Sequence, residues 1–246
     1  MVKDIEKLNP SELFRYLNSP KREEQWGVIS NPGFCRDHVL LFLRNRNLHP
    51  EIIEELASRK DFVKLGAVKY LIAVDPRTPV SLALHMVSML QPMEVVRVAS
   101  DPYAQPAVKQ KAEQRLKEEF PKLPLGLKIT IARIAPPRLH PIFFEERELQ
   151  VLKAFLENPR LKEETVLWFL EQEDLPGEIL QHLYLRTRWG LLQRVKFKIA
   201  RHPSTPIPIV LRILNELLPH QLEELEKDEN QPDVVLNRIR ALLGKE

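Results

Sequence analysis

The chain has 246 residues, 43% of them hydrophobic and 29% charged, which is enough apolar surface to bury a sizeable core. The net charge of +3 mixes 37 basic with 34 acidic residues, so it permits an acidic partner without requiring a nucleic acid. The single cysteine, Cys35, excludes an intramolecular disulfide. With no apolar leader and no stretch long enough for a membrane span, we expect a cytoplasmic protein.

Prolines and glycines indicate the fold class. The chain has 21 prolines and only 7 glycines, and the prolines separate apolar stretches of helical period, which predicts many short helices. Residues 125–134 are the only β-leaning stretch, and we expect a helix there because the repeat described below places one. An all-α fold of about fourteen helices follows, with two or three of the shortest segments as single turns. The expected segments are 11–18, 20–30, 35–45, 50–59, 62–74, 79–90, 93–100, 106–119, 124–134, 145–157, 162–173, 177–186, 189–201, 206–217, 219–227 and 232–243.

The chain also contains an internal repeat. Residues 31–90 align without a gap on residues 158–217, an offset of 127 positions that places Asn31 on Asn158. Self-similarity at a fixed period is typical of repeat architectures. We therefore expect one continuous solenoid over residues 1–246, made of two tandemly duplicated halves, 1–122 and 123–246.

A proline corner recurs inside this repeat. It reads Val-(Lys/Arg)-x-x-(Ile/Val)-Ala-x-x-Pro-x-x-Pro in Val68–Pro79 and Val195–Pro206, with looser copies at Val95–Pro106 and Ile129–Pro141. The first proline should end a helix, because the residue before a proline is disfavoured in the α region. Thr78 is then expected to cap the N-terminus of the next helix, with proline at its first position, as is its counterpart Thr205.

This corner, together with the 44-residue spacing from Pro32 to Pro76 and from Pro159 to Pro203, resembles bacterial HEAT-like repeats of the leucine-rich-repeat-variant type. The resemblance covers about half of the chain. It implies a right-handed superhelix of helix pairs that offers an extended surface to a partner. An iron–sulfur cluster found in some such proteins needs several cysteines, so it does not transfer. HEAT-like alkylpurine DNA glycosylases are a weaker resemblance, from which no catalytic residue can be placed here.

We find no motif for catalysis, a cofactor or a metal. The sequence lacks a P-loop, a dinucleotide-binding glycine pattern and the two-histidine zinc motif of metalloproteases. Cys35 and His38 would supply only two of the three or four ligands that zinc needs, so we expect an ordinary thiol and a surface or capping imidazole. Paired glutamates lie beside basic residues and are expected on solvated helix faces.

The strongest local signal is a run of basic residues between positions 186 and 201. The candidate binding residues there are Arg186, Arg188, Arg194, Lys198 and Arg201. Three of them have i, i+4, i+7 spacing and share a helix face, which we call the basic stripe: Arg194, Lys198 and Arg201. The repeat places Ala67, Leu71 and Val74 at the same positions of the first half, so the fold itself does not require positive charge there.

Two explanations of the basic stripe remain open. It can bind phosphates, nucleic acid or an acidic protein surface. Alternatively, it is a solvated face paired with acids of neighbouring helices, either Glu171, Glu173 and Asp174 or Glu216 and Glu223. The second explanation is the more common one for charged helices. Trp189 and Trp168 replace Phe62 and Leu41 of the first half, so we expect both in the core, and Leu191 is expected to join the core contacts of the basic helix.

The apolar counterpart of the stripe in the first half has two interpretations as well. Its residues, with those of the following helix, can belong to the core, which we favour, or can form an exposed groove for a partner helix. The residues concerned are Ala67, Leu71, Val74, Leu82, Met86 and Met89.

These observations favour a non-catalytic scaffold that binds a protein partner along its concave helical face. The alternative is a nucleic-acid-binding or DNA-repair protein that uses the basic residues at 186–201. A small-molecule enzyme is the least favoured class, because no catalytic constellation is present. The partner itself cannot be identified from the residues.

Overall fold

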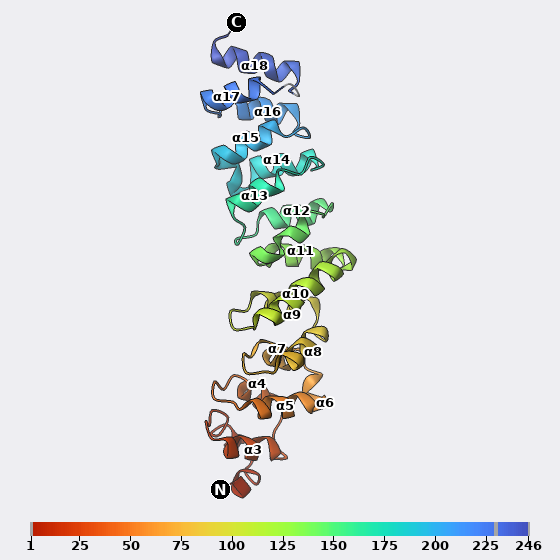
Figure 1. Cartoon of the computed structure of the whole chain (residues 1–246), viewed down its shortest axis with the longest axis vertical. Helices are drawn as coiled ribbons and strands as arrows, with labels where there is room; N and C mark the ends of the chain where they lie inside the picture. Colours follow the sequence, from red (N-terminus) through yellow and green to blue (C-terminus); the bar gives the residue numbers. More distant parts are fainter. Residues whose placement is uncertain (1, 229–230, 246) are drawn as a thin grey trace. The chain divides into compact units, whose positions relative to one another are not determined.

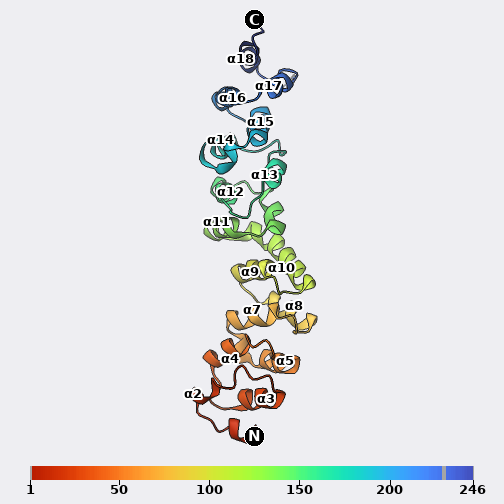
Figure 2. The same cartoon turned by 90° about the vertical axis from the view of Figure 1, so that its left-hand side faces the viewer.

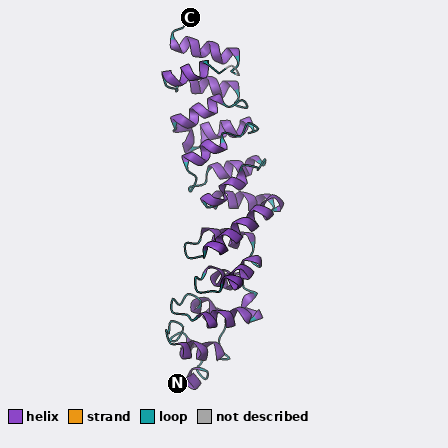
Figure 3. Ribbon diagram, viewed as in Figure 1, coloured by secondary structure: helices purple, strands orange, loops and turns teal. Residues whose placement is uncertain are grey.

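The computed structural model describes residues 2–228 and 231–245, and these residues are helices joined by loops and turns (Figures 1 and 3). No strand occurs within those ranges, which confirms the all-α prediction. Residues 125–134, the β-leaning stretch, form a helix as expected. The contacts divide the chain into two compact units, Met1–Glu119 and Phe120–Glu246.

The first unit contains ten helices among its described residues, most of them of two or three turns. Several of these helices begin with proline. Proline is favoured at the first helical position because the N–H that it lacks would have no partner there. In chain order they are α1 (Val2–Ile5), α2 (Pro10–Leu13), α3 (Arg22–Ser30), α4 (Arg36–Phe42), α5 (Pro50–Ser58), α6 (Lys60–Val63), α7 (Gly66–Val74), α8 (Val80–Ser88), α9 (Pro92–Ser100) and α10 (Pro106–Glu119).

The described part of the second unit contains eight α-helices and three 3₁₀ segments. Its elements are η1 (Phe120–Lys122), α11 (Leu125–Ile134), η2 (Pro137–Phe143), α12 (Leu149–Leu156), α13 (Glu163–Phe169), α14 (Gly177–Arg186), η3 (Arg188–Leu191), α15 (Gln193–Arg201), α16 (Ile207–Leu214), α17 (Pro219–Glu226) and α18 (Asp233–Leu243). Two pairs of helices have bounds that coincide at the offset of 127 residues, namely α4 with α13 and α7 with α15.

Within each unit the helices form two layers. In the first unit α7 contacts both α4 and α9, while α8 contacts α10, and Figure 2 shows α4, α7 and α9 on one side of that unit with α5, α8 and α10 on the other. In the second unit α13 contacts α15, and on the other side α12 contacts α14 and α16 contacts α18 (Figure 2). Each helix therefore buries one face against the other layer and leaves an opposite face outward.

The core lies between the layers of each unit. In the second unit it includes a cluster of buried phenylalanines. The rings of Phe143 and Phe155 stack with centroids 4.8 Å apart, and the Phe169 ring meets Phe155 at 5.8 Å. In the first unit the inward residues of α7, Val68 and Ile72, are fully buried. The small residue that follows Ile72, Ala73, is also buried and leaves room for a neighbouring helix to approach.

Two buried asparagines satisfy helix ends that would otherwise carry unpaired carbonyls. The Asn31 side-chain amide donates to the carbonyls of Ile5 and Leu8, at 2.8 and 3.0 Å. At the offset of 127 residues, Asn158 donates to the carbonyls of Ala132 and Ala135 at the same two distances. Each asparagine Oδ1 also accepts a backbone N–H two residues later, from Gly33 and from Arg160. The Asn-Pro dipeptide thus ties the loop after α3 to the end of α1, and the loop after α12 to the end of α11.

The proline corners form, but the threonines act differently from the prediction. The Thr78 hydroxyl donates to the Ile72 carbonyl at 2.7 Å, and the Thr205 hydroxyl donates to the Ile199 carbonyl at 2.6 Å. Both hydroxyls therefore satisfy the end of the preceding helix, and the predicted N-cap role is wrong. The next helices begin one residue later, with Pro79 and Pro206 as their N-caps.

The apolar residues that correspond to the basic stripe, and those of the helix that follows, differ in how exposed they are. Val74 and Met86 are buried, as the core interpretation predicts. Leu71, Leu82 and Met89 are half-buried, and Ala67 is exposed. The core prediction is therefore wrong for Ala67, because this position lies on the outward side of the first turn of α7.

A candidate interaction surface on α13 and α15

Helix α15 separates apolar and basic residues cleanly. Val195, Ile199 and Ala200 are buried against the unit. Arg194 and Arg201 are exposed and Lys198 is half-buried, so the basic stripe lies on the outward side as its spacing predicts. Because α13 contacts α15 in the same layer, the acids of α13 lie beside this stripe.

Every residue of the basic stripe faces a carboxylate. Arg194 Nη1 lies 3.6 Å from Glu163 Oε1, and Lys198 Nζ lies 3.4 Å from Glu171 Oε1. Arg201 reaches Asp228 Oδ2 at 3.1 Å and Glu224 Oε1 at 3.7 Å. Glu171 is one of the acids named from the sequence, whereas Glu163, Glu224 and Asp228 are not. Exposed pairs of this kind contribute at most about 1 kcal/mol each to stability, so their main effect is to lower the local positive potential.

The other two candidate residues lie away from the stripe. Arg188, in η3, places its guanidinium 4.3 Å from the Trp189 ring centroid and donates to the Leu161 carbonyl at 3.0 Å. Arg186, the last residue of α14, lines a shallow cleft of about 200 Å³ together with Lys153 of α12. The five basic residues therefore do not form one continuous patch.

Trp168 is a candidate interaction residue that the sequence interpretation missed. Its side chain is 65% exposed on the outward side of α13, so the prediction that it belongs to the core is wrong. Val166, Leu167 and Phe169 already provide the inward face of this short helix. Glu164, at i−4 from Trp168, shares its face of α13, and this charged neighbour was the available signal.

Two further residues of this region were expected in the core. Trp189 is 5% exposed, and its indole N–H donates to the Leu156 carbonyl at 3.0 Å, which confirms the prediction for this tryptophan. Leu191 is 78% exposed at the end of η3, so the prediction for this leucine is wrong. The 3₁₀ turn ends the apolar pattern before α15 begins, and this rotates Leu191 outward.

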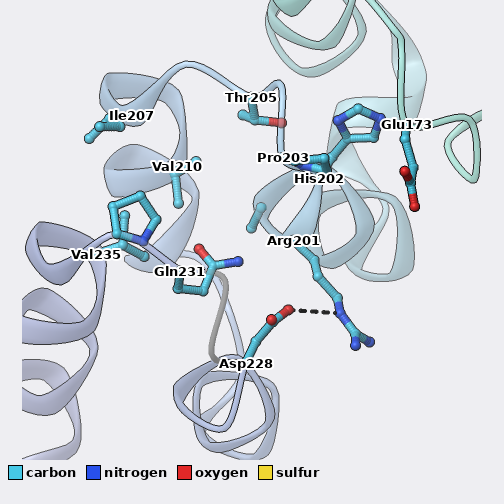
Figure 4. Close-up of a pocket in the computed structure, with 12 residues that line it drawn as sticks. Glu173, Arg201, His202, Pro203, Thr205, Ile207, Val210, Asp228, Gln231 and Val235 are labelled. Atoms are coloured by element: carbon cyan, nitrogen blue, oxygen red, sulfur yellow. Dashed lines mark hydrogen bonds and ion pairs between the residues drawn. The ribbon is translucent and has the colours of Figure 1, made fainter.

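A cleft of about 600 Å³ adjoins the end of the basic stripe (Figure 4). Ile207, Val210 and Val235 form one wall, and Arg201 pairs with Asp228 at the other side. The polar groups of the proline corner at Pro203 already have hydrogen-bond partners. His202 Nε2 lies 2.7 Å from the Gln172 carbonyl, and its Nδ1 accepts the Ser204 N–H at 3.1 Å.

A polar cluster with two buried members, Lys196 and Tyr184, lies beneath α15. Lys196 Nζ is 2.7 Å from Glu216 Oε2, and the Tyr184 hydroxyl donates to the other oxygen of the same carboxylate. Burial and this hydrogen bond raise the pKa of Tyr184 to about 12. The hydrogen bonds from Lys196 and Tyr184 lower the pKa of Glu216. The cluster joins α14, α15 and the end of α16.

No three His, Cys, Asp or Glu side chains come together as metal ligands in the described part of the chain. His38 is buried, with Nε2 2.8 Å from the Pro10 carbonyl and Nδ1 accepting the Cys35 N–H at 3.1 Å, so it is a capping imidazole and not a surface one. Among these same residues, no helix is both long and apolar enough to cross a membrane. No protein-family model, curated protein or solved structure matches the chain.

Proposed function

We propose that this chain is a cytoplasmic, non-catalytic scaffold that binds a protein partner through the outward face of α13 and α15. We further propose that it is built as a HEAT-like α-solenoid, resembling bacterial repeats of the leucine-rich-repeat-variant type, from two tandemly duplicated halves. The face that binds the partner, which we call the Trp168 surface, consists of Glu164, Trp168, Glu171, Arg194 and Lys198.

The duplication is supported by features that recur at the offset of 127 residues. Helices α4 and α13 have matching bounds, as do α7 and α15. The two buried asparagines and the two corner threonines make corresponding hydrogen bonds in both units. Chance similarity of composition does not explain side chains that bond to equivalent backbone atoms.

Trp168 carries the proposal of a protein-binding site. A tryptophan exposed to 65% leaves most of a large apolar ring in water, where it adds little to the stability of the isolated chain. The equivalent residue of the first unit is Leu41, so the fold does not need an indole at this position. Tryptophan is among the residues most enriched at the centres of protein interfaces, where truncation costs about 2 kcal/mol or more.

The nucleic-acid alternative has less support. All three residues of the basic stripe face carboxylates within 4.0 Å, and Glu163, Glu171 and Glu224 would repel a phosphate backbone. Arg186 and Arg188 lie outside the stripe. The alternative therefore remains a prediction that a DNA-binding measurement can test.

The partner can be sought by immobilising the full chain and recovering stoichiometric protein from an extract of the native host. Trp168→Ala should reduce recovery at least about tenfold, because losing about 2 kcal/mol weakens binding by more than that factor. Leu41→Ala is the matched control, since it shortens the equivalent residue of the first unit and should leave recovery unchanged. Equal recovery with Trp168→Ala would contradict the proposal.

A further inference from the structure

Two clusters in the described part of the chain combine a tyrosine ring, a carboxylate and an arginine. In the first unit the Tyr70 hydroxyl donates to Asp101 Oδ2 at 2.6 Å, and the Arg97 guanidinium lies 4.2 Å from the Tyr70 ring centroid. Ring, carboxylate and arginine thus form one cluster, in which the neighbouring helix α9 supplies the cation to a ring on α7.

The second unit repeats this arrangement on different helices. The Tyr184 hydroxyl donates to Glu216, and the Arg212 guanidinium lies 5.8 Å from the Tyr184 ring centroid. Here α16 supplies the cation to a ring on α14. A guanidinium over an aromatic face is attracted by the ring quadrupole, and the nearby carboxylate adds to the attraction.

At Trp168 the ring and a neighbouring carboxylate are present without the cation. Glu164 lies on the same face of α13 as the indole, at i−4, whereas Glu171 follows the helix, which ends at Phe169. Lys198 and Arg194 of the neighbouring helix are engaged with Glu171 and Glu163 instead. Among the described residues, no cation lies over the Trp168 ring and no basic residue pairs with Glu164.

We infer that the protein partner supplies this cation: an arginine of a basic segment that stacks on Trp168 and pairs with Glu164. The inference rests on the proposed function and names the chemistry of the partner. An acidic segment would be repelled by Glu164, whose charge is not paired as that of Glu171 is by Lys198. A purely apolar helix would bury the charge of Glu164 without a partner, which is unfavourable.

The first test uses the full chain and a synthetic probe. The probe is the acetylated, amidated peptide Gly-Arg-Gly-Arg-Gly, and its matched control carries citrulline, the neutral isostere of arginine. The indole N–H signals of the three tryptophans are followed by ¹H–¹⁵N NMR, and the Trp168 signal is assigned by its loss in Trp168→Phe. We expect the arginine peptide to shift the Trp168 signal and leave that of buried Trp189 in place.

The inference is tested by whether binding depends on the positive charge of the peptide. The citrulline peptide should bind about two- to fivefold more weakly, the size expected for an exposed cation–π contact. Trp168→Leu, followed through the backbone signals of α13, and Glu164→Gln should each weaken the arginine peptide by a similar factor. Asp37→Asn, which neutralises the residue equivalent to Glu164 in the first unit, should have no effect. Equal binding of both peptides, or no shift with either, would overturn the inference, as would a Trp168 shift produced by single-stranded oligonucleotides alone.

A second test separates this inference from the proposed function. A photo-crosslinking phenylalanine derivative replaces Thr165, which lies at i−3 from Trp168 and leaves the indole intact, and the crosslinks are formed in the native host. A protein crosslinked through an arginine-bearing segment supports both proposals. A protein crosslinked through an acidic or apolar segment overturns the arginine inference and leaves the scaffold proposal standing. If no protein crosslinks, both proposals fail.

Discussion

Lys196 Nζ lies 2.7 Å from Glu216 Oε2, and this contact ties the buried lysine of α15 to the partly exposed carboxylate that follows α16. In the first unit the equivalent Lys69 donates to the Met89 carbonyl at 2.8 Å. Position 89 corresponds to position 216, so both units hold the lysine at the same place. The second unit uses a carboxylate, which also accepts the Tyr184 hydroxyl.

Glu216→Ala should destabilise the second unit because it leaves Lys196 and Tyr184 without their acceptor. The Glu216 side chain is partly exposed, so we expect a loss of about 1–2 kcal/mol in the free energy of unfolding, less than for a fully buried pair. Urea denaturation measures this. Glu223→Ala, an exposed acid of α17, is the control and should change the free energy by less than about 0.5 kcal/mol. Similar values for the two variants would show that the cluster contributes nothing.

Stability should fall at alkaline pH through two tyrosines, the half-buried Tyr70 and the buried Tyr184. Burial, with the hydrogen bonds to Asp101 and Glu216, raises the pKa values of Tyr70 and Tyr184 to about 12, above the usual 10.0. A folded-state pKa above the unfolded value means that this contribution is complete below pH 10 and is lost as the pH rises towards 12. Denaturation curves taken across that window should show the loss, and the double variant Tyr70→Phe, Tyr184→Phe should flatten it. An unchanged slope in the double variant would refute the assignment.

Asn158→Ala should destabilise the protein strongly, although it changes only one small side chain. It removes two donated hydrogen bonds and one accepted bond. The Ala132 carbonyl at the end of α11 loses its side-chain donor, and the Ala135 carbonyl keeps only its contact with His140 Nε2 at 3.2 Å. We expect about 2–3 kcal/mol of lost stability. Hydrogen exchange should locate the effect in the second unit, whereas Asn31→Ala should act on the first. An effect spread evenly over both units in either variant would argue against separate anchoring roles.

Truncation should destabilise the protein much more at Trp189 than at Trp168. Trp189→Ala removes a buried ring and its hydrogen bond to Leu156, so it should cost about 3–5 kcal/mol. Trp168→Ala removes an exposed ring and should cost less than about 1 kcal/mol. Urea unfolding of the two variants, with acrylamide quenching of the remaining fluorescence, provides the comparison. A large loss in Trp168→Ala would mean that this indole packs in the core.

DNA binding should be weak because the basic stripe is neutralised by its neighbours. At about 50 mM salt we expect nonspecific duplex binding no tighter than about 10⁻⁴ M. The double variant Glu163→Gln, Glu171→Gln frees Arg194 and Lys198 and should bind more tightly. Fluorescence anisotropy of a labelled duplex measures both proteins. Tight, salt-sensitive binding of the native chain, abolished by charge reversal of the basic stripe, would favour the nucleic-acid alternative instead.

Local features of the fold followed from the residues alone. The proline corners at Pro76 and Pro203 end helices because proline restricts the residue before it, an effect that needs no tertiary contact. The repeat predicted a helix at residues 125–134 despite their β-leaning composition, and the structure confirms it. The threonine hydroxyls were misjudged because Thr78 has two acceptable partners, and only the path of the loop brings the Ile72 carbonyl nearer.

The candidate site was only partly predictable. The outward direction of Arg194, Lys198 and Arg201 followed from helical spacing. Their partners did not, because Glu163 and Asp228 lie about 30 positions away from the cations and meet them only when neighbouring helices pack.

By itself, then, the amino-acid sequence determined that this chain is helical, where most helices end, and which side of α15 is charged, because backbone sterics and residue spacing act over a few positions. The packing of neighbouring helices decided that Trp168 faces solvent while Trp189 is buried, since both replace apolar residues of the first half and differ only in what surrounds them. Tertiary packing also decided that the stripe is paired with acids, because ion pairs between helices depend on how those helices pack side by side.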